Sequence, residues 1–112
     1  MQDFIVSGKT GEVYAEVDIF EDDSMAHFYG GEILDYRFPA ELANLVAAYD
    51  EAVNTMTLGT LDELESKIYA YDLRLKEMGC KIFDLYIEDK ELVTFFTKYP
   101  SGDGFLDDYP GK

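Results

Sequence analysis

The sequence is poor in the residues that most metal and nucleophilic sites require. It has one cysteine, one histidine and no tryptophan among 112 residues. A single Cys80 cannot form an internal disulfide, which is typical of proteins in a reducing compartment. A structural zinc site takes a larger set of cysteine and histidine ligands than this chain contains. We therefore expect neither a zinc site nor a disulfide framework.

Catalysis and other metal sites are not indicated either. His27 lies in an expected strand and Cys80 follows an expected helix end, so nothing in the sequence brings them together as base and nucleophile. The acidic clusters at Glu21–Asp23 and Asp103–Asp108 lack the alternating donors, central glycine and final glutamate of a calcium loop. We predict that the protein is not an enzyme and holds no cofactor or metal.

Long apolar runs are absent as well. No stretch approaches the ~20 apolar residues of a membrane-spanning helix. The first residues, Met1–Val6, contain Asp3 and no basic side chain, so they lack the pattern of a secretory signal peptide. With the single cysteine, these features predict a soluble, cytoplasmic protein that has no membrane partner.

Basic residues are few, and they are unevenly distributed along the chain. The chain has 9 Lys and Arg against 24 Asp and Glu, which gives a net charge of −15. Residues 1–63 carry −12 of this charge, because only Lys9 and Arg37 offset their 14 acids. Such a field repels nucleic acid and anionic membranes and attracts basic surfaces. We expect a basic protein partner and no direct contact with nucleic acid.

Apolar residues are nevertheless plentiful, at 47% of the sequence. That content can offset the entropy of ordering the chain, so charge does not make the protein disordered. A chain of 112 residues has room for a single core. We assign residues 1–100 to one domain and expect 101–112, with three glycines and three acids, to be a flexible acidic tail.

The first third of the chain has strand patterns. An apolar run at 4–6 is followed by turn formers at 8–11, and 12–20 then alternates with the period of a strand. A third strand is expected over 26–36, interrupted by a bulge or bend at Gly30 and Gly31. The alternation predicts that Val13, Ala15, Val17 and Ile19 face the core, while Glu12, Tyr14, Glu16 and Asp18 face solvent.

The middle of the chain predicts two helices. Pro39 suits a first helical turn, and apolar residues recur at helical spacing after it until Thr55–Gly59. Thr60 and Glu63 have the spacing of a capping box for the second helix. That helix is expected to cover the sheet and to end at Gly79, along a stripe formed by Leu61, Leu64, Ile68, Tyr71, Leu75 and Met78.

The last part of the chain returns to strand patterns. Strands are expected at 83–88 and 91–99, joined by a turn at Asp89 and Lys90. The order β-β-β-α-α-β-β predicts an α+β fold, with an antiparallel sheet of about five strands and two helices packed on one face. The other face of this sheet is then left open to solvent.

The open face is the candidate partner-binding site. Side chains on one face of a strand repeat every ~6.8 Å, so the acids of 12–18 form a row of carboxylates. Carboxylates beside tyrosines bind arginine and lysine through salt bridges and cation–π contacts. A face that only keeps the protein soluble has the same composition. The predicted binding residues are Glu12, Tyr14, Glu16, Asp18, Glu21, Asp22, Asp23, Asp84 and Tyr86.

These features favour a small acidic inhibitor that occludes a basic, nucleic-acid-binding or nuclease-like protein. Two settings fit equally well: an immunity protein or antitoxin, and a phage-type inhibitor that mimics nucleic acid against a host defence enzyme. The alternatives are a small enzyme or small-molecule-binding domain with a pocket between sheet and helices, and a structural subunit of a larger assembly. An enzyme or small-molecule site needs a cavity with converging polar groups. The sequence leaves the partner and the oligomeric state open.

Overall fold

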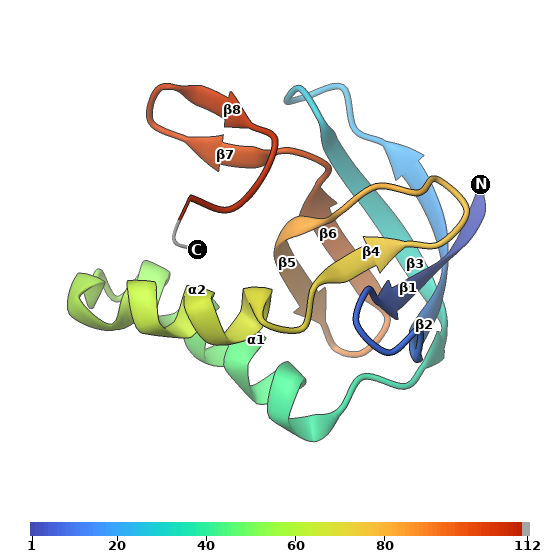
Figure 1. Ribbon diagram of the computed structural model, residues 1–112, viewed down its shortest axis with the longest axis horizontal. Helices are drawn as coiled ribbons and strands as arrows, with labels where there is room; N and C mark the ends of the chain where they lie inside the picture. Colours follow the sequence, from blue (N-terminus) through green and yellow to red (C-terminus); the bar gives the residue numbers. More distant parts are fainter. Residues whose placement is uncertain (111–112) are drawn as a thin grey trace.

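A curled antiparallel sheet with two helices beside it organises the protein (Figure 1). A computed structural model describes residues 1–110, apart from the side chain of Leu58. The predicted α+β fold is confirmed, although the main sheet has six strands rather than five. The elements are β1 (Gln2–Ser7), β2 (Val13–Glu21), β3 (Phe28–Tyr36), α1 (Ala40–Asn54), η1 (Leu58–Thr60), α2 (Leu61–Tyr69), β4 (Leu73–Leu75), β5 (Phe83–Glu88), β6 (Leu92–Phe96), β7 (Tyr99–Ser101) and β8 (Gly104–Leu106).

The main sheet has the strand order β4-β1-β2-β3-β6-β5, and its neighbouring strands are antiparallel. The predicted β5–β6 hairpin is confirmed: Glu88 pairs with Leu92, and both turn residues, Asp89 and Lys90, adopt positive φ. The helices and the inner face of the sheet enclose one apolar core. Its most deeply buried members include Ile5, Val17, Leu42, Leu75, Val93 and Phe95.

The second helix is shorter than predicted. It ends at Tyr69, and Asp72, at φ 53°, turns the chain out of the helical conformation. Leu75, expected on the helical stripe, lies instead in β4 opposite Ile5 of β1. The edge of the sheet provides backbone partners for this segment, and Leu75 is fully buried there.

The signals for the ends of that helix also fail. Thr60 is the N-cap residue, but its hydroxyl donates to the Thr57 carbonyl and makes no capping bond, so the predicted capping box is wrong. Gly79 has the expected positive φ of 71°, but in the turn between β4 and β5, where its N–H bonds to the Leu75 carbonyl. Met78, the last residue of the predicted stripe, is exposed.

Tyr14 is buried, which contradicts its predicted place on the open face. Ala15 pairs with Ile5 and Val13 with Val6, so Tyr14 is an extra residue at a β-bulge. A bulge interrupts strict alternation, because two residues of one strand then oppose a single residue of its neighbour. Tyr14 consequently turns inward beside Ala15 and is only 5% exposed.

β3 is continuous through its two glycines, so the predicted break at that point is wrong. The register shift lies farther along the strand, since Asp35 pairs with Glu16 but Ile33 pairs with Val17. The glycines serve close approach instead. A Cβ at Gly31 would lie 2.8 Å from the Cγ2 of Ile19, and one at Gly30 would lie 3.0 Å from the ring of Phe20.

Of the predicted flexible tail, 101–112, the structure describes 101–110 and places part of it in a hairpin, whereas 111–112 lie outside the described residues. Tyr99–Ser101 and Gly104–Leu106 pair as the β7–β8 hairpin (Figure 1). Beyond the hairpin, Tyr109 is buried in a second apolar cluster with Phe83 and Phe96. Aromatic burial offsets the entropy of ordering a segment that is rich in glycine and acids.

Candidate partner-binding surface

The strand register shows which side chains share the open face of the sheet. Directly paired residues of antiparallel strands point to the same face. Phe20 pairs with Gly30, Gly30 with Thr94, and Thr94 with Tyr86. This row crosses four strands and carries aromatic side chains at both ends, with small residues between them.

A row of acids runs beside it. Asp18 pairs with Glu32, Glu32 with Leu92, and Leu92 with Glu88. Three carboxylates and one leucine therefore lie next to the aromatic row on the same face. The predicted combination of acids and aromatics is present, although the residues that provide it are only partly those predicted.

A groove of about 150 Å³ lies over these two rows. Gly30 and Gly31 line it, and Gly30 leaves room in the aromatic row, because a Cβ there would lie 3.0 Å from the Phe20 ring. Phe20, Tyr86 and Leu92 also line the groove and are 61%, 38% and 46% exposed. Exposed aromatic and aliphatic side chains around a concave surface are the usual composition of an energetic centre in a protein interface.

A second hollow of about 160 Å³ adjoins the groove, and the two share Tyr86 and Thr94. Its other residues come from the end of α1, from the start of β3 and from β5. The charged residues that line the two hollows are Asp22 and Glu88 in the groove and Asp50 and Asp84 in the second hollow. We use the name Tyr86 surface for Phe20, Tyr86 and Leu92 together with Asp22, Asp50, Asp84 and Glu88.

The charged groups of the Tyr86 surface are all carboxylates, but their environments differ. The backbone N–H of Ser24 donates to Asp22 and lowers the pKa of that exposed carboxyl group. Loss of hydration raises the pKa of Asp84, and repulsion by the Asp50 carboxylate raises it further. A cation bound between Asp50 and Asp84 would relieve this repulsion, so the second hollow favours a positive group.

The space where α1 and α2 meet β5 is almost filled. The hollow lined by Tyr49, Glu65 and Asp84 has a volume of about 10 Å³, roughly the room that one water molecule needs. Burial raises the pKa of Glu65, although the Tyr99 hydroxyl donates to it at 2.7 Å and works against that rise. A substrate does not fit in this hollow.

The structure separates the predicted binding residues into groups. Asp22, Asp84 and Tyr86 line the two hollows, and Asp18 lies in the neighbouring row. Tyr14 is excluded by its burial. The remaining residues line neither hollow: Glu12, Glu16, Glu21 and Asp23.

Sequence reasoning missed Asp50 of α1, and it missed four residues of the sheet: Phe20, Glu32, Glu88 and Leu92. The alternation of β2 held the signal for Phe20, because Phe20 has the same parity as Glu16 and Asp18. The other three depend on which strands lie side by side, and local patterns do not reveal that.

His27 and Cys80 pack in different surroundings. His27 has φ 61° just before β3, and its ring lies 4.9 Å from that of Phe105. Cys80 packs half-buried against the main core, where loss of hydration raises the pKa of its thiol. Among the described residues, no group of three or more His, Cys, Asp or Glu side chains is placed to hold a metal ion.

The chain matches no protein-family model, and neither the curated proteins nor the solved structures contain a match. Within residues 1–110, none of the helices combines the length and the apolar character needed to cross a membrane.

Proposed function

We propose that this protein is a small, cytoplasmic inhibitor that binds a basic protein through the Tyr86 surface and occludes the surface it covers. One observation carries the proposal. Exposed Phe20, Tyr86 and Leu92 line the groove of the open face, and the charged residues of the groove and of the adjoining hollow are all acidic. A partner that presents arginine or lysine beside apolar groups has the complementary chemistry.

Solubility alone accounts for less of this surface. A solubilising face needs charge but gains nothing from exposed Phe20, Tyr86 and Leu92, which favour association. Acids around an apolar centre instead resemble the rim and core of a protein interface. The net charge of −15 adds long-range attraction for a basic partner, which speeds encounter.

Binding to a defined basic probe tests the proposal. A hexa-arginine peptide with blocked ends is titrated into ¹⁵N-labelled protein, and the shifts of the backbone amides are followed. We expect the largest shifts at Phe20, Tyr86 and Thr94. Shifts spread over all acidic segments, or absent from the Tyr86 surface, would contradict the proposal.

Two charge-reversed variants separate the site from the general field. Asp22→Lys with Glu88→Lys changes the Tyr86 surface, whereas Glu12→Lys with Glu77→Lys makes the same change in net charge at exposed residues outside it. We expect the first pair to lower affinity for the peptide about tenfold and the second by less than about threefold. Equal losses would mean that only the overall charge matters.

A further inference from the structure

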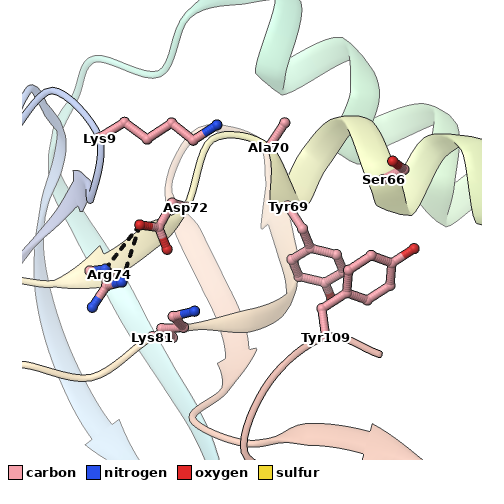
Figure 2. A pocket seen from close by; sticks show the side chains of 8 residues that line it. All are labelled: Lys9, Ser66, Tyr69, Ala70, Asp72, Arg74, Lys81 and Tyr109. Carbon is pink, nitrogen blue, oxygen red and sulfur yellow. Dashed lines mark hydrogen bonds and ion pairs between the residues drawn. The ribbon is translucent and has the colours of Figure 1, made fainter. Parts of the chain in front are cut away.

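A third cavity has the opposite charge. Its volume is about 390 Å³, and it lies where the end of α2, β4 and the C-terminal segment meet (Figure 2). Lys9, Arg74 and Lys81 line it, together with one acid, Asp72. Three of the chain's 9 basic residues thus surround one cavity in a protein with a net charge of −15. The volume is in the range of small-molecule sites, which is ~300–1,000 Å³.

The backbone brings these bases together across a long sequence separation. Lys9 comes from the turn after β1, Arg74 from β4, and Lys81 from just before β5. The Gly8 N–H donates to the Asp72 carbonyl at 2.7 Å. A Cβ at Gly8 would lie 2.2 Å from the Asp72 carboxylate, so a larger residue there would displace the side chain of Asp72.

The bases keep capacity for a ligand. Arg74 donates two hydrogen bonds to the Oδ2 of Asp72, at 3.2 and 3.1 Å, out of about five N–H donors that an arginine has. Lys81 donates to Asp108 at 2.7 Å. Among residues 1–110, Lys9 makes no such ion pair, and its side chain extends along the cavity (Figure 2). Asp72 and Asp108 balance two of the three bases, so one positive charge remains.

Aromatic rings line the cavity opposite the bases. The rings of Tyr69 and Tyr109 lie 4.4 Å apart at 31° (Figure 2). Ser66 adds a hydroxyl group to the lining. Cationic donors facing aromatic rings suit a ligand that has an anionic group at one end and a planar apolar group at the other.

We propose that this cavity binds a small organic phosphate, with the phosphate at Lys9, Arg74 and Lys81 and an aromatic group against Tyr69 and Tyr109. A phosphate carries more charge than a carboxylate and matches the remaining donors of Arg74. This site lies apart from the Tyr86 surface and does not depend on the function proposed for that surface.

Phenyl phosphate is the probe, compared with inorganic phosphate and with phenol by calorimetry and amide shifts at fixed ionic strength. We expect phenyl phosphate to bind at least about threefold more tightly than either. Lys9→Gln and Lys81→Gln should each weaken binding of phenyl phosphate about threefold to tenfold, because each removes a charge next to the anion. Lys90→Gln makes the same change in charge in the β5–β6 turn and should leave affinity unchanged.

Each other outcome overturns the proposal or part of it. If Lys90→Gln weakens binding as much as Lys9→Gln, the probe binds an unspecific surface. If no probe binds, the cavity is not a site for small organic phosphates, and the proposal is wrong. If phenol binds as tightly as phenyl phosphate, the cavity is an apolar site. If inorganic phosphate binds as tightly as phenyl phosphate, the aromatic group contributes nothing to binding. Lys9 is exposed, so its variant is expected to fold and keeps the test decisive.

Discussion

The Tyr86 surface and the cavity lined by Lys9, Arg74 and Lys81 differ in charge and in how the chain builds them. The Tyr86 surface gathers acids around exposed apolar side chains, mostly from paired strands of one sheet. The cavity gathers three bases from a turn, an edge strand and the segment before β5. A chain with a net charge of −15 therefore still gathers its acids at one site and several of its bases at another.

The two regions also differ in how strongly they are tied to folding. Tyr86 stands partly in solvent, whereas Tyr69 packs on Phe83, Tyr99 and Tyr109. The Tyr69 hydroxyl also accepts a hydrogen bond from the Asp84 N–H at 3.1 Å. The Tyr86 surface can thus be altered with little effect on the fold, but the aromatic wall of the cavity cannot.

The largest expected effect tests this difference in stability. Tyr69→Ala should lower the free energy of unfolding by ~3–5 kcal/mol, the range for a packed aromatic side chain. Tyr86→Ala should lower it by less than ~1 kcal/mol, since its ring is partly solvated. Urea unfolding of the two variants measures both values. Similar losses in the free energy of unfolding would mean that Tyr69 and Tyr86 are equally important for the fold, and the proposed difference between the two regions would be wrong.

The next effect concerns affinity at the Tyr86 surface. Phe20→Ala should weaken binding of the hexa-arginine peptide about tenfold, because it removes an exposed ring that a guanidinium group can stack on. Phe105→Ala is the matched control, as Phe105 is also an exposed phenylalanine and lines neither hollow. Fluorescence anisotropy of a labelled peptide measures both affinities, and an equal loss would move the interface elsewhere.

A smaller effect separates the two regions by salt. Raising ionic strength from about 20 to about 300 mM should slow association of the basic peptide several-fold, because salt screens the attraction of the acidic field. Phenyl phosphate should respond by less than about twofold, since screening weakens both its local attraction and its repulsion by the whole protein. Stopped-flow and calorimetric measurements give the two responses. A peptide on-rate that is indifferent to salt would remove the electrostatic basis of the proposed function.

The smallest effect lies within the Tyr86 surface and depends on pH. The pKa of Asp84 is raised in the folded state, so the folded protein holds that proton more tightly than the unfolded chain. The resulting stability is present below the ordinary pKa of 3.8 and is lost as pH rises through the raised folded pKa. Asp84→Asn should therefore remove a decrease in stability that begins as pH rises above the ordinary pKa of 3.8.

Asp22→Asn provides the control of opposite sign. The pKa of Asp22 is lowered, so its contribution to stability is present above the ordinary pKa and is lost as pH falls through the folded pKa. Urea unfolding measures both variants, and for Asp22→Asn the pH range extends well below the ordinary pKa of 3.8. If the two substitutions changed the pH dependence in the same direction, the contrast between the two carboxyl environments would be wrong.

Local patterns predicted most of the sheet because they are short and repetitive. The alternation of 12–20 reflects the period of a strand, and the β5–β6 hairpin reflects the turn chemistry of Asp89 and Lys90. Both depend on residues that are close together in the sequence. The same reasoning failed at Leu75. Its helical spacing from Ile68 and Tyr71 was real, but the segment pairs with β1, and this tertiary contact buries Leu75 in the core.

The candidate site was predictable only where one strand determines it. The outward parity of β2 indicated Asp18 and also held the signal for Phe20. Glu32, Leu92 and Glu88 join them through pairings with β3, β6 and β5, which depend on sheet order. The bulge that turns Tyr14 inward likewise arises from a mismatch between two strands and leaves no mark on either sequence alone.

The sequence by itself determined the charge, the fold class and the strand periods, because composition and local alternation set them directly. Only the tertiary structure decided which acids and apolar residues meet at Tyr86 and which bases meet at Lys9. It also decided the burial of Asp3, whose carboxylate accepts hydrogen bonds from the N–H groups of Phe4, Glu77 and Met78. Contacts across some 70 residues depend on strand order and close packing, and no local pattern encodes either.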